Sequence, residues 1–512
     1  MDVNSGNAKN TTGVVPMMNM MRINIARSFA ILVLVLVAGL TMAQNNITNM
    51  WNQAGGTHNW TDSGNWTNTA AYPDGANALA ILTNNITSSQ TINLNQAISL
   101  GNLWVGDPNG DAAFTIAAGT GGRLAVATPG VGSCAINKYG TNTDVVAVAV
   151  TNVAGINRST YVRALTSGGT LVFSNAVYGG AGSLRTDGNV GTINFAGTGN
   201  SLGDQGFFSI GSGIVLLTGS GIANSLSVPG SLAVRNGVFT NNMATYIGQY
   251  NVAGTLTVDG GSFLSRQGTR VGCNSATERS GLGSLIVTNG GVCTSTGGVF
   301  RLYGSNTASY VATVTLAGGA GGPGVLDLST NITAFLTTAD ATNNYINFNG
   351  GKLRYSNTIV DQQNFIASNI VVTVMEGGAQ IEVSTAGRVV TIANALRHAG
   401  AAATDGGLTK SCAGTLVLSG TNTYTGATIV SNGVLRTTHA QCLSTNTDLY
   451  LFTSAGELNL NFNGTNIVRS LTIDGTRRGT GIYGASRILQ ITGDGCLQTT
   501  WPPLKEGVIL IW

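Results

Sequence analysis

The chain has 512 residues, of which 43% are hydrophobic, only 9% are charged and 73 are glycine. Charged residues make up about a quarter of an ordinary globular protein, so this composition excludes a set of amphipathic helices, while the hydrophobic content is too high for a disordered chain. The formal net charge is +3, and the absence of any basic stripe or acidic block argues against nucleic acid or an anionic membrane as a partner.

The amino terminus has the pattern of a secretory signal peptide. Arg22 and Arg27 precede an apolar run at residues 29–40, and small residues follow it up to Ala43. The run is shorter than a comfortable membrane span, so we expect residues 1–43 to be a leader that is cleaved after Ala43. No membrane span would then remain in the exported chain; a retained anchor is the alternative.

Residues 44–100 are rich in tryptophan. Trp51, Trp60 and Trp66 are half of the chain's six tryptophans. We expect this segment to form an amino-terminal cap, because the open end of a repeat array exposes apolar core and backbone that bulky rings can cover. An exposed aromatic platform for a sugar ring is the alternative interpretation.

Residues 101–339 contain an irregular repeat built around Gly-x-Leu-x-Val. Strand starts at Gly254, Gly283 and Ala312 follow one another at intervals of 29 residues, and Gly230 lies 24 residues before the first of them. A single unit of this kind cannot bury its own apolar edge, so the spacing predicts stacked coils of about three short parallel strands each, an all-β solenoid.

Other all-β folds fit the repeat less well. A sandwich would show hairpin signals every 8 to 12 residues or so, and a propeller would have a period near 40. The chain has only 8 prolines, which agrees with strands that pair on both edges. Apolar-Gly pairs such as Val105-Gly106 mark further copies of the same coil.

The most regular copy lies at residues 407–436, with the sequence GLTKSCAGTLVLSGTNTYTGATIVSNGVLR. Gly-x-Leu openings occur at Gly414, Gly433 and Gly456, at spacings of 19 and 23 residues. Each spacing is the length of one solenoid coil. We therefore expect the segment 340–499 to continue the same array, and residues 500–512 to be a tail in which the periodicity ends.

The block at 407–436 resembles the bacterial autotransporter-associated β-strand repeat. The resemblance implies a secreted or surface-displayed right-handed parallel β-helix and no particular chemistry. Cys412 and Ala427 stand where the family usually has glycine, so local strain is expected there first. The residues that match the family pattern, which we expect to build or decorate a coil, are Lys410, Gly414, Leu416, Leu418, Gly420, Asn422, Tyr424, Gly426, Thr428 and Gly433.

Candidate chemistry is sparse in this sequence. Glu376 and Glu382 straddle a Gly-Gly turn and are the carboxylate pair to test for polysaccharide cleavage, solvated turn residues being the simpler interpretation. Asp107, Asn109 and Asp111 alternate as calcium ligands do, but no closing glutamate follows, and a plain Asx turn is favoured. The three histidines are isolated along the chain, which makes Ser/His/Asp catalysis a weak hypothesis.

The six cysteines show no CxxC spacing, so a zinc site is not expected. Cys273 and Cys293 are candidates for neighbouring coils, with buried free thiols as the favoured state.

The sequence predicts no catalytic, cofactor-binding or metal-binding residue. The expected function is that of a non-enzymatic β-solenoid for structure, display or adhesion, exported to the extracellular space, the cell surface or the periplasm. Its expected partners are glycans or cell-surface and matrix polymers. The alternative is a carbohydrate-active β-helix enzyme, such as a polysaccharide lyase or glycoside hydrolase, or a glycan-binding module. The ending implies either a freely secreted chain or a truncated gene.

Overall fold

The computed structural model describes residues 47–127, 133–153, 158–180, 182–202, 207–248, 252–272, 282–304, 310–334, 343–452 and 456–501. The expected leader, Cys273 and nearly all of the expected tail lie outside these ranges. The described strands belong to one compact unit, Asn46–Trp512. Within the described ranges, no helix is long and apolar enough to cross a membrane. The expected internal boundaries at residues 100, 339 and 499 stay predictions.

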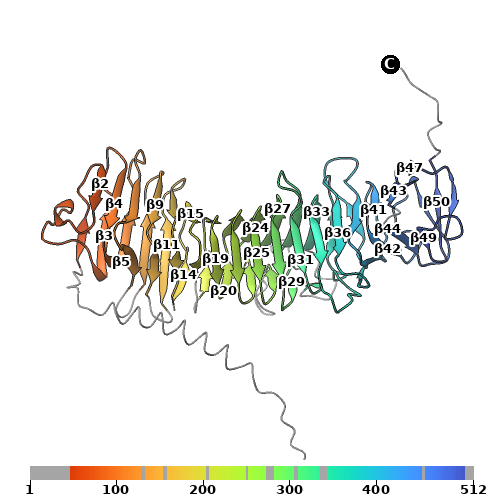
Figure 1. Cartoon of the computed structure of the whole chain (residues 1–512), viewed down its shortest axis with the longest axis horizontal. Helices are drawn as coiled ribbons and strands as arrows, with labels where there is room; N and C mark the ends of the chain where they lie inside the picture. Colours follow the sequence, from red (N-terminus) through yellow and green to blue (C-terminus); the bar gives the residue numbers. More distant parts are fainter. Residues whose placement is uncertain are drawn as a thin grey trace, which may run out of the picture. The chain divides into compact units, whose positions relative to one another are not determined.

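The described chain forms stacked coils of short parallel strands (Figure 1). A typical coil has three strands, β24 (Gly254–Asp259), β25 (Ser262–Ser265) and β26 (Thr269–Val271). Each strand pairs in parallel with the equivalent strand of the coils before and after it, so the stack has three faces. The predicted all-β parallel β-helix is confirmed.

The first face is one ladder, closed by an antiparallel hairpin between its last two strands. Its strands are β1 (Thr48–Met50), β3 (Gly75–Leu82), β5 (Ala97–Val105), β7 (Arg123–Val126), β10 (Val150–Asn152), β13 (Val177–Tyr178), β16 (Asn200–Ser201), β19 (Ser220–Ala223), β22 (Val238–Asn241), β25, β28 (Val292–Ser295), β31 (Val325–Leu328), β34 (Lys352–Tyr355), β36 (Ala379–Val383), β39 (Leu408–Ser411), β41 (Thr428–Val430), β43 (Asp448–Leu451), β46 (Ser470–Ile473) and β47 (Thr476–Arg477).

The second face branches from the first at β5, which pairs with both β7 and β8. Isolated bridges from Ile332 to Ile366 and from Gln362 to Val390 connect its two runs. The strands are β8 (Cys134–Lys138), β11 (Ser159–Ala164), β14 (Ser183–Arg185), β17 (Phe207–Ser209), β20 (Ser225–Val228), β23 (Thr245–Ile247), β26, β29 (Phe300–Leu302) and β32 (Ile332–Ala334), then β37 (Val389–Ile392), β40 (Thr415–Leu418), β42 (Gly433–Thr437), β44 (Gly456–Leu460) and β49 (Ile491–Thr492).

The third face is a 14-stranded sheet. Its strands are β2 (Gly56–Asn59), β4 (Gln90–Leu94), β6 (Phe114–Ala118), β9 (Thr143–Ala147), β12 (Thr170–Phe173), β15 (Thr192–Phe195), β18 (Ile214–Leu217), β21 (Ser231–Arg235), β24, β27 (Gly283–Thr288), β30 (Ala312–Ala317), β33 (Asn344–Asn349), β35 (Val371–Val374) and β38 (Leu396–His398). A small sheet of β45 (Thr465–Val468), β50 (Cys496–Thr499) and β48 (Gly481–Tyr483) lies at the carboxyl end of the described chain, and the described residues contain no α-helix, only the 3-10 turn η1 (Ser63–Asn65).

The strand register agrees with the spacings counted in the sequence. Gly254 pairs with Gly283, and Gly283 pairs with Ala312. In the most regular block, Gly433 pairs with Gly456. Residues at equivalent positions of the repeat are therefore direct neighbours across consecutive coils, as predicted.

The core runs through the middle of the stack, because side chains of a strand alternate between the interior and the outer surface. On the third face, the interior column contains Leu256, Leu285, Val314 and Ile346, all fully buried. Burying one such side chain contributes about 1.5–3 kcal/mol, which offsets the ordering of a short coil.

The bend between the first and second faces holds a buried polar ladder. Asn241 Nδ2 donates a hydrogen bond to Thr245 Oγ1 at 2.9 Å, and Thr245 Oγ1 donates to Ser265 Oγ at 2.9 Å. In the next coil, Thr269 Oγ1 donates to Ser295 Oγ at 3.2 Å. These bonds satisfy side chains that have no access to water, so the bend stays polar without a desolvation penalty.

The three amino-terminal tryptophans are buried in the first described coils. Trp51 and Trp66 lie edge to face with ring centroids 5.0 Å apart, as do Trp60 and Trp66 at 4.9 Å. All three rings are fully buried, and the indole N–H of Trp51 donates to Gln90 Oε1. Buried rings cannot serve as an exposed sugar platform; the cap assignment itself stays a prediction.

Candidate functional site

The residues of the repeat at 407–436 form the interior and turns of a coil. Lys410 points inward from β39 and is fully buried. Its Nζ donates to the carbonyl oxygens of Ser411, Cys412 and Asn432 at 2.8, 2.7 and 3.1 Å. Burial lowers the pKa of Lys410 to about 8, while the three acceptors hold the ammonium in place. Lys410 thus closes a turn and does not face a ligand.

Tyr424 is also part of the interior. It is fully buried, and its hydroxyl lies 2.6 Å from Thr428 Oγ1, which in turn lies 2.9 Å from Thr447 Oγ1. The chain of hydroxyls ends where Thr447 Oγ1 donates to the Gly426 carbonyl at 2.8 Å. Burial raises the pKa of Tyr424, so its hydroxyl remains a neutral link between adjacent coils.

The remaining pattern residues have packing and turn roles. Leu416 and Leu418 are fully buried, and Asn422 Oδ1 accepts from the backbone N–H of Leu396 at 2.8 Å. A Cβ added to any of the pattern glycines would lie within 2.5 Å of an atom of the adjacent coil or turn, which explains the residue type at Gly414, Gly420, Gly426 and Gly433.

Backbone strain occurs at one of the two positions where it was expected. Cys412 has a φ of 66°, in the left-handed region, whereas Ala427 does not; the neighbouring Gly407 takes a φ of 74° instead. The expectation is confirmed for Cys412 and wrong for Ala427. The other described non-glycine residues in this region are types that tolerate it, Asn236, Asn289 and Asp474.

Cys412→Gly is expected to stabilise the protein by about 1 kcal/mol, because glycine adopts a positive φ without steric cost. Chemical denaturation of the full chain, followed by circular dichroism, measures the change. Ala427→Gly is the matched control, and it is expected to give no gain. Equal gains at both positions would contradict the strain at Cys412.

The structure does not join Glu376 and Glu382 into one site. Glu382 forms ion pairs with Lys352 Nζ at 2.6 Å and Arg354 Nε at 2.7 Å, and these two partners lower its pKa although burial opposes them. Glu376 is exposed and accepts backbone N–H groups at Ala401 and Ala402. The two carboxylates therefore have separate partners.

The Asp107 to Asp111 segment forms a turn. The Asp107 carboxylate is buried and accepts the backbone N–H of Ala112 at 3.1 Å, and Asn109 Nδ2 donates to Asp111 Oδ2 at 2.9 Å. Contact with Asp107 raises the pKa of Asp111. Over the described ranges, no group of three or more His, Cys, Asp or Glu side chains is arranged to hold a metal ion.

His398 has a carboxylate partner that the sequence did not reveal. Its Nδ1 lies 2.9 Å from Asp405 Oδ2 and 3.3 Å from Thr425 Oγ1. A catalytic triad needs the acid and the nucleophile on opposite ring nitrogens. Here both approach the same nitrogen, so the cluster is a turn network in which Asp405 also accepts N–H groups from Gly407 and Gly426.

Five described cysteines carry free thiols. Cys134, Cys293 and Cys442 are fully buried, and burial raises the pKa of Cys293 to about 12. Such thiols behave as small apolar side chains.

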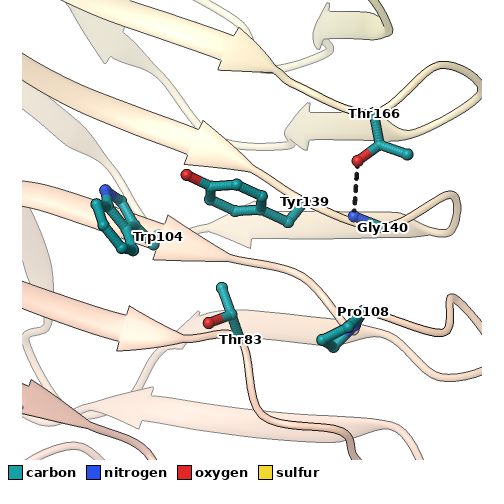
Figure 2. A pocket seen from close by; sticks show the side chains of 6 residues that line it. All are labelled: Thr83, Trp104, Pro108, Tyr139, Gly140 and Thr166. Atoms are coloured by element: carbon teal, nitrogen blue, oxygen red, sulfur yellow. Dashed lines mark hydrogen bonds between the residues drawn. The ribbon is translucent and has the colours of Figure 1, made fainter.

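A surface groove of about 380 Å³ lies across the first coils. Trp104 of β5 and Tyr139, which follows β8, form its aromatic walls, with ring centroids 5.9 Å apart and planes at 59°. Both rings are half-buried. The remaining residues that line the groove, drawn in Figure 2, are Thr83, Pro108, Gly140 and Thr166.

The hollow exists because position 106 is glycine. The backbone N–H of Gly106 bonds to Leu82 and that of Tyr139 to Val105, which places Thr83, Gly106 and Tyr139 at equivalent positions of three coils. Gly106 has a φ of 135°, and a Cβ there would lie 1.8 Å from the Tyr139 carbonyl oxygen. No side chain therefore fills the space between Thr83 and Tyr139.

A buried ion pair anchors the Tyr139 wall from inside. Lys138 Nζ lies 3.0 Å from Asp144 Oδ2, with both side chains essentially unexposed. The same ammonium donates to Gly140 O at 3.0 Å, to Asn142 Oδ1 at 2.8 Å and to Tyr139 O. Burial lowers the pKa of Lys138 and raises that of Asp144. The turn that carries Tyr139 is thus held by a fixed cation.

Sequence reasoning did not identify the groove. Trp104, Tyr139 and Thr166 are far apart in the chain and meet only through coil stacking. One signal was present: Tyr139-Gly140 has the same apolar-Gly form as Val105-Gly106, and Trp104 lies directly before that pair.

Comparison with known proteins supports the repeat assignment. The family model described as passenger-associated-transport-repeat matches residues 408–436, the block with the most regular spacing. No curated protein and no solved structure matches the chain. The match confirms the resemblance to autotransporter passenger repeats.

Proposed function

We propose that this chain, which carries a passenger-associated-transport-repeat, is an exported, non-enzymatic passenger solenoid with a structural or adhesive role at the cell surface. The observation that carries the proposal is the continuity of the three faces through the matched block. Strand β40 of that block pairs with β37 before it and β42 after it, so the matched segment is one coil of the stack and not a separate module.

The outer surface of the third face supports an adhesive role. Thr255, Ser284, Thr313 and Tyr345 follow one another across consecutive strands at one outward position. Parallel strands lie about 4.8 Å apart, so the column offers hydroxyl groups at a regular interval. Such an array suits weak, repeated contacts with glycans or matrix polymers better than one deep pocket does.

The partners of the candidate carboxylates support a non-enzymatic role. An acid and a base for glycoside cleavage must both face the substrate, about 5 to 9.5 Å apart. Glu382 is instead bound to two cations in a network that also includes Asp327, whose Oδ2 lies 3.6 Å from Arg354. These contacts suit a role in joining three coils.

Export and display are tested with the full chain in a secreting bacterium. We expect the mature protein to begin at Gln44 and to be accessible to protease or antibody on intact cells, and we expect no turnover of neutral or acidic polysaccharides. A chain retained inside the cell contradicts the export part of the proposal. Polysaccharide cleavage that Glu382→Ala abolishes contradicts the non-enzymatic part.

A further inference from the structure

We propose that the groove between Trp104 and Tyr139 binds one hexopyranose ring of an uncharged polysaccharide. The site deepens the proposed function, on which it rests only in that an exported chain meets such polymers. A second observation within the solenoid, the buried cation behind Tyr139, assigns Lys138 the role of a positioning residue.

The aromatic walls favour a sugar ring. A hexopyranose presents a flat face of C–H groups, which packs against an aromatic ring, and a rim of hydroxyls, which needs hydrogen-bond partners. The two rings, 5.9 Å apart and inclined at 59°, offer one face for packing and one edge beside it. Thr83 and Thr166 place side-chain hydroxyls at the two ends of the groove (Figure 2).

The charge pattern favours an uncharged sugar. None of the residues that line the groove carries a charge. The nearby Arg163 packs over the Tyr161 ring at 4.1 Å, and its Nε donates to the Asp187 carbonyl at 2.7 Å. Lys138 is buried and paired with Asp144. A uronate carboxylate would therefore lose hydration in the groove without gaining an ion pair there.

The direction of the groove favours a polymer. Its walls come from four successive coils, since Thr83, Trp104, Tyr139 and Thr166 lie one coil apart from one another. The coil spacing of about 4.8 Å is close to the length of one hexopyranose unit. A chain that lies along the coil stack can place one ring in the groove while its neighbours rest on adjacent coils.

Lys138 fixes the position of the Tyr139 ring. Its ammonium binds the carbonyl oxygens on both sides of the Tyr139–Gly140 peptide, and Gly140 N donates to Thr166 Oγ1 at 3.1 Å. The chain also offers a matched residue, Lys410, a second fully buried lysine that closes a turn in a distant coil. Substitution of either lysine removes a buried cation, but only Lys138 lies behind the groove.

Binding is measured on the full chain by isothermal titration and ligand-observed NMR, with cellohexaose as the uncharged probe and hexagalacturonate as the charged one. We expect a Kd of about 1 mM or tighter for cellohexaose and no detectable binding of hexagalacturonate. Trp104→Ala is expected to weaken cellohexaose binding about tenfold or more, since it removes the larger packing surface. Trp501→Ala is the control; this ring is 44% exposed and lies between Arg469 and Arg477 in a distant coil.

The lysine variants test the positioning role. Lys138→Met is expected to weaken cellohexaose binding several-fold, whereas Lys410→Met leaves it unchanged although it also alters stability. Circular dichroism confirms that each variant folds, and Tyr139→Phe, which keeps the ring and the backbone, is expected to bind within about twofold of the parent chain. If Lys138→Met does not fold, the Tyr139 chemical shifts of Asp144→Asn, which perturbs the same pair, take its place.

The outcomes separate this proposal from the proposed function. Cellohexaose binding that survives Trp104→Ala, or tighter binding of hexagalacturonate, overturns the groove assignment and leaves an exported solenoid intact. Loss of binding in Trp104→Ala, in a chain that is found inside the cell, overturns the proposed function and leaves the groove. No binding of cellohexaose by the parent chain overturns the groove proposal alone.

Discussion

Gly433→Ala is expected to destabilise the repeat coil by roughly 3 kcal/mol or more. Gly433 has a φ of 69°, and a Cβ at this position would lie 2.3 Å from the Cys412 carbonyl oxygen and 2.5 Å from that of Gly414. Both contacts are with backbone, so no side-chain rotation relieves them. The substitution therefore adds a clash to the cost of a left-handed alanine.

The control for this effect is Gly475→Ala. Gly475 has a φ of 77°, but no atom lies within 4 Å of its Cβ position, so only the conformational cost of about 1–2 kcal/mol is expected. Hydrogen exchange of peptides from β40, β42 and β44 measures the local loss, which a single global transition can conceal in a long repeat array. Equal effects of the two substitutions would contradict the close packing at Gly433.

The second large effect is a pH dependence of stability that Lys410 produces. Its pKa falls from 10.5 to about 8 on folding. Between these values the unfolded chain carries a proton that the folded chain has released, so a rise in pH opposes unfolding. The free energy of unfolding of the parent chain is expected to rise, relative to Lys410→Met, by up to about 3 kcal/mol from pH 8 to 10.5.

Urea denaturation of both proteins from pH 7 to 10.5 measures this difference. Ile381→Met is the matched control, because Ile381 pairs with Lys410 at the adjacent interior position and the variant keeps the lysine. Its pH profile is expected to run parallel to that of the parent chain. A Lys410→Met profile that runs parallel as well would show that the lysine does not release its proton in this range.

The coil architecture was predictable because it depends on local counting. The intervals between Gly254, Gly283 and Ala312 gave the register directly, since parallel stacking puts equivalent residues side by side. The strain at Cys412 was predictable for a similar reason: a glycine position of a known turn was occupied by another residue.

The groove was not predictable in the same way. Trp104 and Tyr139 lie 35 residues apart, and the number of residues between their coils differs from the intervals elsewhere in the array. Their contact depends on the register at β5 and β8, which only the pairing of Trp104 with Asn137 establishes. The ion pair of Lys138 and Asp144 was hidden for another reason, because charged residues in an interior column contradict the pattern that identifies the column.

The parallel ladders also determine how such a chain is able to fold. A strand such as β27 has its partners in β24 and β30, a few tens of residues away on either side, and none at the far ends of the sequence. Once a few coils have formed, each new coil docks on an existing edge, so folding propagates from a nucleus without long loop closures. A chain that emerges gradually from one end meets this requirement at every step.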